Sequence, residues 1–172
     1  MSAPDRTGAA AGPLALPAQI HATALIIGEC GLLIRGKSGS GKSALARTLL
    51  AQSRDQGSFS CLIGDDIVRV SQAGGLIVAR PHPEIAGRME VRGLGILNFE
   101  YEPAAVLRCV VDLENMTTGG GNLPRIPEKS HKYTQFGEVF LPRLQLPASC
   151  SAADNAEVTL LFLEDILHPA AK

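Results

Sequence analysis

The segment RGKSGSGKSA at residues 35–44 constrains the fold more than any other part of the chain. It contains the pattern G-x-x-x-x-G-K-[ST], which is typical of a phosphate-binding loop between a strand and a helix. The sequence predicts both the strand before this loop and the helix after it. The apolar run LLIR (32–35) indicates a buried strand, and KSALARTLLAQS (42–53) has alanine and leucine at helical spacing.

Each residue type in this loop has a physical reason. Glycines allow consecutive backbone N–H groups to turn inward and form a nest for an anion. A helix that begins near Lys42 adds unpaired N–H groups and the positive end of its dipole. The Lys42 ammonium is suited to the β- and γ-phosphates, and the Ser43 hydroxyl is suited to Mg²⁺. The predicted nucleotide contacts are Gly36, Lys37, Ser38, Gly39, Ser40, Gly41, Lys42 and Ser43.

Asp65 and Asp66 end an apolar run about twenty residues after the loop. Neighbouring side chains at a strand end point to opposite faces, so the two carboxylates need not share one task. One is suited to holding Mg²⁺ and the other to accepting a proton from an attacking hydroxyl. A solvated turn is the structural alternative, and the nearby phosphate-binding loop favours the functional interpretation.

The segment MEVRGLGILN (89–98) places Glu90 and Arg92 two residues apart, so on a strand their side chains share a face. A carboxylate and a guanidinium aimed at one spot are suited to a metal and a phosphate. On these residues alone, an exposed ion pair in a glycine-kinked strand is the favoured interpretation. A structural role is likewise favoured for His21, a lone histidine in an apolar strand.

The remaining pattern predicts one mixed α/β domain over 18–172, after an Ala-, Gly- and Pro-rich flexible tail at 1–17. We expect a mixed sheet packed around the 42–53 helix, with a long functional loop at 114–132. The expected strands are 19–28, 32–35, a strand ending at the aspartates within 61–70 and another following it, 76–81, 104–113 and 136–147. The final apolar run, 158–167, fits either a strand or a helix.

Composition excludes several classes of function. The net charge of -1 and the 4% aromatic content argue against nucleic-acid binding and against an anionic membrane surface. The N-terminus does not fit a signal peptide, and no apolar run approaches the ~18 residues of a membrane span. The four cysteines form no C-x-x-C pair, so free thiols in a reducing cytoplasm are expected.

Four segments, in order along the chain, resemble the C-terminal catalytic domain of the HPr kinase/phosphorylase family. They are IHATALII (20–27), GKSGSGKS (36–43), LIGDD (62–66) and MEVRGLGILN (89–98). The resemblance covers roughly residues 18–147, and the last segment looks like the family signature. It implies a P-loop fold related to phosphoenolpyruvate carboxykinase. It also implies ATP-dependent phosphorylation of a serine on the small phosphocarrier protein HPr, and in many members removal of that phosphate by phosphorolysis.

The resemblance implies a role for individual residues. Lys42 would contact the phosphates of ATP, and Ser43 and Glu90 would ligate Mg²⁺, with Asp65 as the metal-facing carboxylate of the aspartate pair. Asp66 would be the base that takes the proton of the target serine, and the acid in the reverse reaction. The signature residues carried over are Glu90, Arg92, Gly93, Gly95 and Asn98.

Two further residues gain a catalytic role through the resemblance. His21 falls where the family carries a catalytic histidine, which reverses the interpretation from the residues alone. Arg125 stands twelve residues before Gly137, the spacing of the family's catalytic loop arginine.

The sequence departs from the typical family pattern in two places. A short tail stands where typical members carry a separate N-terminal domain, so the chain resembles the short form of some proteobacteria. PASCSA (147–152) stands where the family continues with a proline–arginine–glycine stretch linked to dephosphorylation. The resemblance therefore supports the kinase direction more strongly than phosphorolysis.

The sequence as a whole predicts a cytoplasmic, ATP- and Mg²⁺-dependent serine kinase that acts on an HPr-like carrier and forms a homo-oligomer. Two alternatives stay open. One is a regulatory module that senses ATP without transferring phosphate, and the other is a P-loop kinase of a small molecule.

Overall fold

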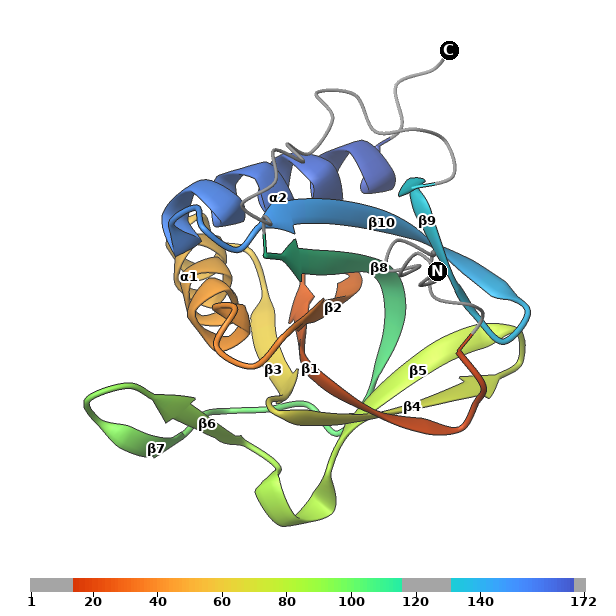
Figure 1. Ribbon diagram of the computed structural model, residues 1–172, viewed down its shortest axis with the longest axis horizontal. Helices are drawn as coiled ribbons and strands as arrows, with labels where there is room; N and C mark the ends of the chain where they lie inside the picture. Colours follow the sequence, from red (N-terminus) through yellow and green to blue (C-terminus); the bar gives the residue numbers. More distant parts are fainter. Residues whose placement is uncertain (1–13, 116–130, 169–172) are drawn as a thin grey trace, which may run out of the picture.

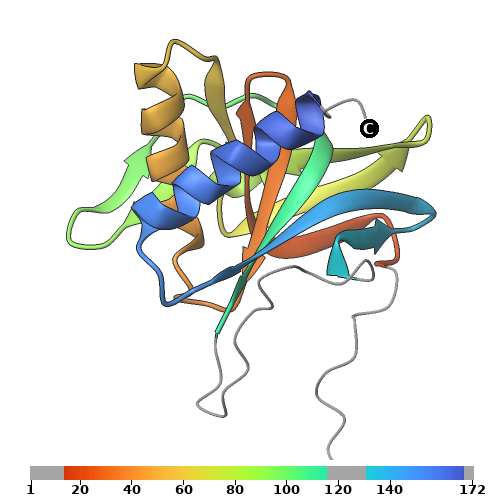
Figure 2. The same cartoon turned by 90° about the horizontal axis from the view of Figure 1, so that it is seen from above.

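The computed structural model describes residues 14–115 and 131–168, which form a mixed sheet with both helices packed against one side (Figures 1 and 2). Residues 1–13 of the predicted tail and the loop position Arg125 lie outside the described residues. The elements are β1 (Ala18–Ile27), β2 (Cys30–Gly36), α1 (Lys42–Asp55), β3 (Ser60–Gly64), β4 (Ile67–Ala73), β5 (Leu76–Pro81), the 3-10 turn η1 (Pro83–Ile85), β6 (Arg88–Val91), β7 (Gly95–Asn98), β8 (Ala105–Glu114), β9 (Tyr133–Phe136), β10 (Val139–Pro147) and α2 (Ala152–Leu167).

Two long strands, β1 and β8, hold the sheet together because each pairs with different neighbours along its length. The first half of β1 is antiparallel to β4, and its second half lies antiparallel to both β2 and β3. β8 begins antiparallel to β5 and continues parallel to β2 and β10. The strands β2, β1, β4, β5 and β8 therefore pair in a closed ring, and β10 and β9 extend it from β8.

The sheet has a hydrophobic core on each side. On the helix side, Leu45 and Leu49 of α1 and Leu163 of α2 pack with buried residues of β1, β2 and β8. On the other side, Val68 of β4 and Phe136 of β9 belong to a second cluster, which lies where the ring of strands folds over itself. The apolar runs of β2 and β8 are buried on both faces for this reason.

The order of the predicted elements agrees with the structure, but two predictions about the architecture are wrong. The 42–53 helix is not central: α1 and α2 lie together on one face of the sheet (Figure 2). The run 136–147 is not one strand, because a turn at Gly137 separates β9 from β10. The ambiguous run 158–167 belongs to a helix, whose N-cap Ser151 accepts a hydrogen bond from the Asp154 N–H.

The described end of the predicted tail, residues 14–17, contacts the folded domain. The Leu14 N–H donates to the carbonyl of Gln135, and the Leu14 and Leu16 side chains pack against the second core. All four cysteines are free thiols, as predicted: Cys30, Cys61 and Cys109 are buried, and Cys150 is exposed. Neither described helix is long and apolar enough to span a bilayer.

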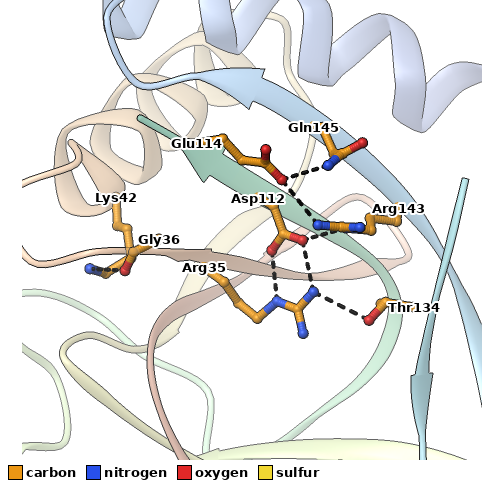
Figure 3. Close-up of polar contacts among 8 residues, drawn as sticks. All are labelled: Arg35, Gly36, Lys42, Asp112, Glu114, Thr134, Arg143 and Gln145. Carbon is orange, nitrogen blue, oxygen red and sulfur yellow. Dashed lines mark hydrogen bonds and ion pairs between the residues drawn. The ribbon is translucent and has the colours of Figure 1, made fainter. Parts of the chain in front are cut away.

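A network of charged side chains joins the start of the phosphate-binding loop to the edge of the sheet (Figure 3). Arg35, the residue before Gly36, donates two hydrogen bonds to Asp112 at 2.7 and 2.8 Å, and Arg143 donates a third. Arg143 also donates to Glu114 at 3.1 Å. Burial opposes ionisation of Asp112, but the hydrogen bonds and charges of Arg35 and Arg143 outweigh it and lower the pKa of that carboxyl.

We expect Asp112→Asn to destabilise the fold by about 3 kcal/mol at pH 7, because it leaves two guanidinium groups without their buried counter-ion. The lowered pKa means that ionised Asp112 stabilises the fold above the ordinary aspartate value of about 3.9, and that this contribution is lost as the pH falls through the folded value. The deficit of the variant, measured by urea denaturation, should therefore shrink in acid. Glu114→Gln, at a half-exposed position of the network, is the matched control and should cost about 1 kcal/mol or less. An equal deficit for Asp112→Asn at pH 7 and pH 3 would contradict this account.

Candidate functional site

A cleft of about 500 Å³ lies where the phosphate-binding loop, the start of α1 and the two aspartates meet. Its remaining wall is the segment from η1 to the β6–β7 hairpin, which projects away from the sheet beside α1 (Figure 1). The sequence-predicted residues that line the cleft are His21, Ser38, Gly39, Gly41, Lys42, Ser43, Asp65, Asp66, Glu90 and Arg92. The cleft thus brings together residues from four separate parts of the chain.

The loop has the backbone conformation that an anion-binding nest requires. Gly39 and Gly41 have φ angles of 76° and 96°, in the left-handed region that glycine adopts without strain. Gly41 is the N-cap of α1 and has no side chain to cap the helix, and the first turn carries no acidic residue. The unpaired N–H groups of that first turn and the helix dipole therefore face the cleft, which suits a phosphate.

Lys42 connects the loop to β1. Its ammonium lies 3.0 Å from the carbonyl oxygen of Gly36 and 3.1 Å from that of Lys37, and it contacts Nε2 of His21 at 3.1 Å. Burial lowers the pKa of Lys42, and the nearby charges of Asp65 and Asp66 act in the opposite direction. The predicted residues Gly36 and Lys37 thus act here through their carbonyl groups, outside the cleft lining.

His21 and Asp66 form the second step of the same chain of contacts. His21 Nδ1 lies 2.9 Å from an Asp66 carboxylate oxygen, and both side chains are about half exposed, at 49% and 63%. An ammonium group only donates hydrogen bonds, so Nε2 of His21 accepts from Lys42, and the Nδ1–H donates to Asp66. Asp66 has a φ of 68°, the single positive value at a non-glycine among the described residues. Its carboxylate is therefore fixed and open to solvent, which suits a general base.

Asp65 points the other way and is buried. Its carboxylate accepts hydrogen bonds from the Ser43 hydroxyl at 2.9 and 3.0 Å and from the Thr23 hydroxyl at 2.6 Å. The two neighbouring aspartates thus have different environments, as the strand geometry predicted. Asp65 and Ser43 thus place oxygen atoms close together at the start of α1.

The signature segment is a hairpin, which corrects one prediction from the sequence. β6 ends at Val91, so Arg92 lies in the turn and not on a strand face shared with Glu90. Both side chains still line the cleft, and no ion pair joins them within the part of the chain that the structure describes. Gly93 and Gly95 have φ angles of 84° and 88° and form the turn, and Asn98 ends β7 away from the cleft lining.

The oxygen groups in the cleft fit Mg²⁺ bound together with a nucleotide. Across residues 14–115 and 131–168 no cluster of three or more metal-ligating side chains occurs. Mg²⁺ commonly keeps several waters and binds to one or two carboxylates and the phosphates of its substrate. Ser43 and Asp65 on one wall and Glu90 on the opposite wall meet that requirement.

Sequence reasoning missed three residues of the site. Thr23 orients Asp65; its spacing of two from His21 on β1, which places both on one strand face, was the signal for it. Arg47 of α1 and Arg88 of β6 also line the cleft and add positive charge near the loop. Arg47 lies one helical turn beyond Ser43, at the spacing that keeps both residues on one face of α1.

Comparison with known proteins identifies the family. The sequence model described as HPr Serine kinase C-terminal domain matches residues 13–159. The chain belongs to this family. An HPr kinase/phosphorylase of Azoarcus sp. is 35% identical over 155 residues, which cover 86% of this chain and 47% of the relative. That of Mycoplasmopsis pulmonis is 31% identical over 136 residues, which cover 75% of this chain and 42% of the relative.

A solved structure supports the same fold. The Hpr(Ser) kinase/phosphatase from Coxiella burnetii aligns with a TM-score of 0.60 at 20% identity, over 87% of this chain and 93% of that chain. The curated relatives are longer: this family domain spans less than half of the two described above.

We expect Gly36→Ala to destabilise the domain by about 2 kcal/mol, because its Cβ would lie 2.5 Å from Ser40 Oγ and 2.8 Å from the Leu113 carbonyl oxygen. The loop must shift to relieve this overlap, so affinity for ATP should also fall. Gly57→Ala is the matched control: Gly57 has a φ of 74° with no atom within 4 Å of a Cβ, so only backbone strain of about 1 kcal/mol is expected. Thermal unfolding and titration with a fluorescent ATP analogue measure both effects. Equal losses of stability in the two variants would show that close packing at Gly36 is unimportant.

Proposed function

We propose that this domain is an ATP- and Mg²⁺-dependent protein kinase that phosphorylates a serine of an HPr-like phosphocarrier protein. One observation carries the proposal: Lys42 of the phosphate-binding loop, His21 and the solvent-open carboxylate of Asp66 form one continuous chain of contacts. In this proposal Lys42 would anchor phosphate beside Asp66 as the general base. The names of the relatives, HPr kinase/phosphorylase, supply the class of acceptor.

The nucleotide phosphates would occupy the nest of the loop, with Lys42 as their charge partner. The ammonium contacts the carbonyl oxygens of Gly36 and Lys37 and Nε2 of His21. Because burial disfavours the charged form of Lys42, a phosphate placed beside it gains a poorly solvated cation as its partner. The first turn of α1 would add N–H donors, and Arg47 and Arg88 would add charge at the cleft wall.

Mg²⁺, when bound, would neutralise charge on the phosphate oxygens. Ser43 and Asp65 would hold it from the loop side, with Glu90 from the hairpin side. Thr23 would keep the Asp65 carboxylate oriented through its 2.6 Å hydrogen bond.

Asp66 would take the proton of the acceptor serine as the serine Oγ attacks the γ-phosphorus. The bond between the γ-phosphorus and the β–γ bridging oxygen breaks, and ADP leaves with that oxygen. His21 would hold the Asp66 carboxylate through its Nδ1–H and keep it close to Lys42. Most of the catalysis in phosphoryl transfer is positioning and charge neutralisation, and the loop and Asp66 are suited to both.

Asp66→Asn should keep nucleotide affinity within about twofold and lower the rate of transfer by about 100-fold or more, because an amide cannot accept the serine proton. Lys42→Ala should instead weaken nucleotide binding and transfer together. Transfer from γ-labelled ATP and titration with an ATP analogue separate the two effects. Retained transfer in Asp66→Asn would show that another group is the base.

Incubation of the purified chain with labelled ATP, Mg²⁺ and the HPr-like carrier of the same organism tests the proposal itself. Labelled phosphoserine on the carrier is the expected result. Nucleotide binding without transfer would favour an ATP-sensing module, and transfer only to small hydroxyl compounds would favour a small-molecule kinase. Incubation of the phosphorylated carrier with inorganic phosphate tests phosphorolysis, which would yield pyrophosphate.

A further inference from the structure

The outer face of β1, β4 and β5 carries a row of polar side chains next to the cleft. Residues alternate between buried and outward-facing positions along these strands, as on a sheet with one solvated face. The strand register places Gln19 of β1 opposite Arg69 of β4, and Arg69 opposite Arg80 of β5. Ser71 stands two residues after Arg69 on the same face and accepts a hydrogen bond from Arg80 at 3.3 Å. We call Gln19, Arg69, Ser71 and Arg80 the arginine shelf.

The two arginines of the shelf lack an acidic partner among the residues that the structure describes. No ion pair within 14–115 and 131–168 involves Arg69 or Arg80. Like charges directly opposite each other on neighbouring strands destabilise a sheet, so the fold itself gains nothing from this pairing. The shelf also lines a hollow of about 270 Å³ at the start of β1. Two exposed guanidinium groups beside a hollow are suited to an anionic group from another molecule.

The shelf continues the same face of β1 that builds the catalytic site. His21 of β1 pairs with Ile67 of β4, and two residues earlier on β1, Gln19 pairs with Arg69. Two residues along a strand span about 7 Å, so the shelf begins about one such step from His21. Any protein that brings a serine to the exposed carboxylate of Asp66 would therefore cover surface close to the shelf.

We propose that the arginine shelf is the docking surface for an acidic segment of the phosphoacceptor protein. The inference rests on the proposed kinase function and names a contact that selects the acceptor. The proposal rests on charge complementarity. Arg69 and Arg80 are positive, have no acidic partner among the described residues, and lie close to the proposed base Asp66. A second nucleotide is a poorer occupant, because the hollow of about 270 Å³ has about half the volume of the cleft at the loop.

The double variant Arg69→Glu/Arg80→Glu tests the proposal. We expect KM for the carrier to rise about tenfold or more, with kcat at saturating carrier and affinity for an ATP analogue within about twofold. Arg54→Glu/Arg108→Glu changes the net charge equally and is the matched control. Arg54 is exposed in the last turn of α1, and Arg108 is exposed near the start of β8; both are remote from the loop along their elements. The control should alter KM by no more than about twofold.

Two further readouts make the result decisive. KM of the parental chain should rise with ionic strength, and this dependence should be weaker in the shelf variant. Calorimetry with an ATP analogue present measures the affinity for the dephosphorylated carrier. This affinity tests the docking role of the shelf independently of phosphate transfer. If the parental chain binds the carrier without transferring phosphate, the kinase proposal fails while the shelf is still judged by the loss of binding.

Three results would overturn the docking proposal. The first is an unchanged KM and an unchanged carrier affinity in the shelf variant. The second is a loss of ATP-analogue affinity without a change in carrier affinity, which would assign the arginines to a small anion. The third is a parental chain that does not bind the carrier at all.

Discussion

The contact between His21 and Asp66 is the interaction on which the arrangement of the candidate site depends. It joins β1 to the residue between β3 and β4, where the backbone adopts a left-handed conformation. On its other side His21 contacts the Lys42 ammonium, so the imidazole bridges the phosphate-binding loop and the carboxylate. A lysine in place of His21 would lack an acceptor for the Lys42 ammonium, and an apolar residue would leave both neighbours without this partner.

A single face of β1 explains why these groups meet. Leu25 on that face belongs to the core beneath the helices, Thr23 holds Asp65, and His21 contacts Lys42. Gln19 then begins the arginine shelf. Side chains on one strand face repeat every two residues. This face therefore carries, in order, a core residue, the partner of Asp65, the proposed catalytic His21 and the proposed docking surface. The register with β4 fixes Gln19 and His21, and the register with β2 fixes Thr23 and Leu25; a slip of one residue would turn this face into the opposite core.

Local patterns were enough to predict the loop, the helix after it and the different environments of Asp65 and Asp66. Each depends on neighbours in the sequence: glycine spacing, helical periodicity and the alternation at a strand end. The resemblance to the family then gave His21 its proposed catalytic role, which its apolar surroundings alone argued against. The contact with Asp66 is consistent with that reversal.

One prediction failed because its outcome depended on distant parts of the chain, and another because a local turn was overlooked. The placement of α2 beside α1 follows from burying a shared apolar surface, which neither helical pattern specifies alone. Arg92 was expected on a strand, but the glycines after it form a tight turn that ends β6 at Val91. The pairing of Arg69 with Arg80 follows from the two-residue turn at Gly74 and Gly75, because the two arginines lie four residues before Ala73 and four after Leu76.

The central claim, that His21 bridges Lys42 and Asp66, is tested most directly by the ¹⁵N NMR spectrum of the imidazole nitrogens. At pH 8 the account predicts the tautomer with hydrogen on Nδ1 and an acceptor nitrogen at Nε2. The His21 signals are assigned by their loss in His21→Gln. Addition of Mg²⁺ and an ATP analogue should shift the Nε2 signal as Lys42 turns to the phosphates, and Asp66→Asn should perturb Nδ1. A tautomer with hydrogen on Nε2, or nitrogen signals unchanged by both the nucleotide and the Asp66 variant, would contradict it.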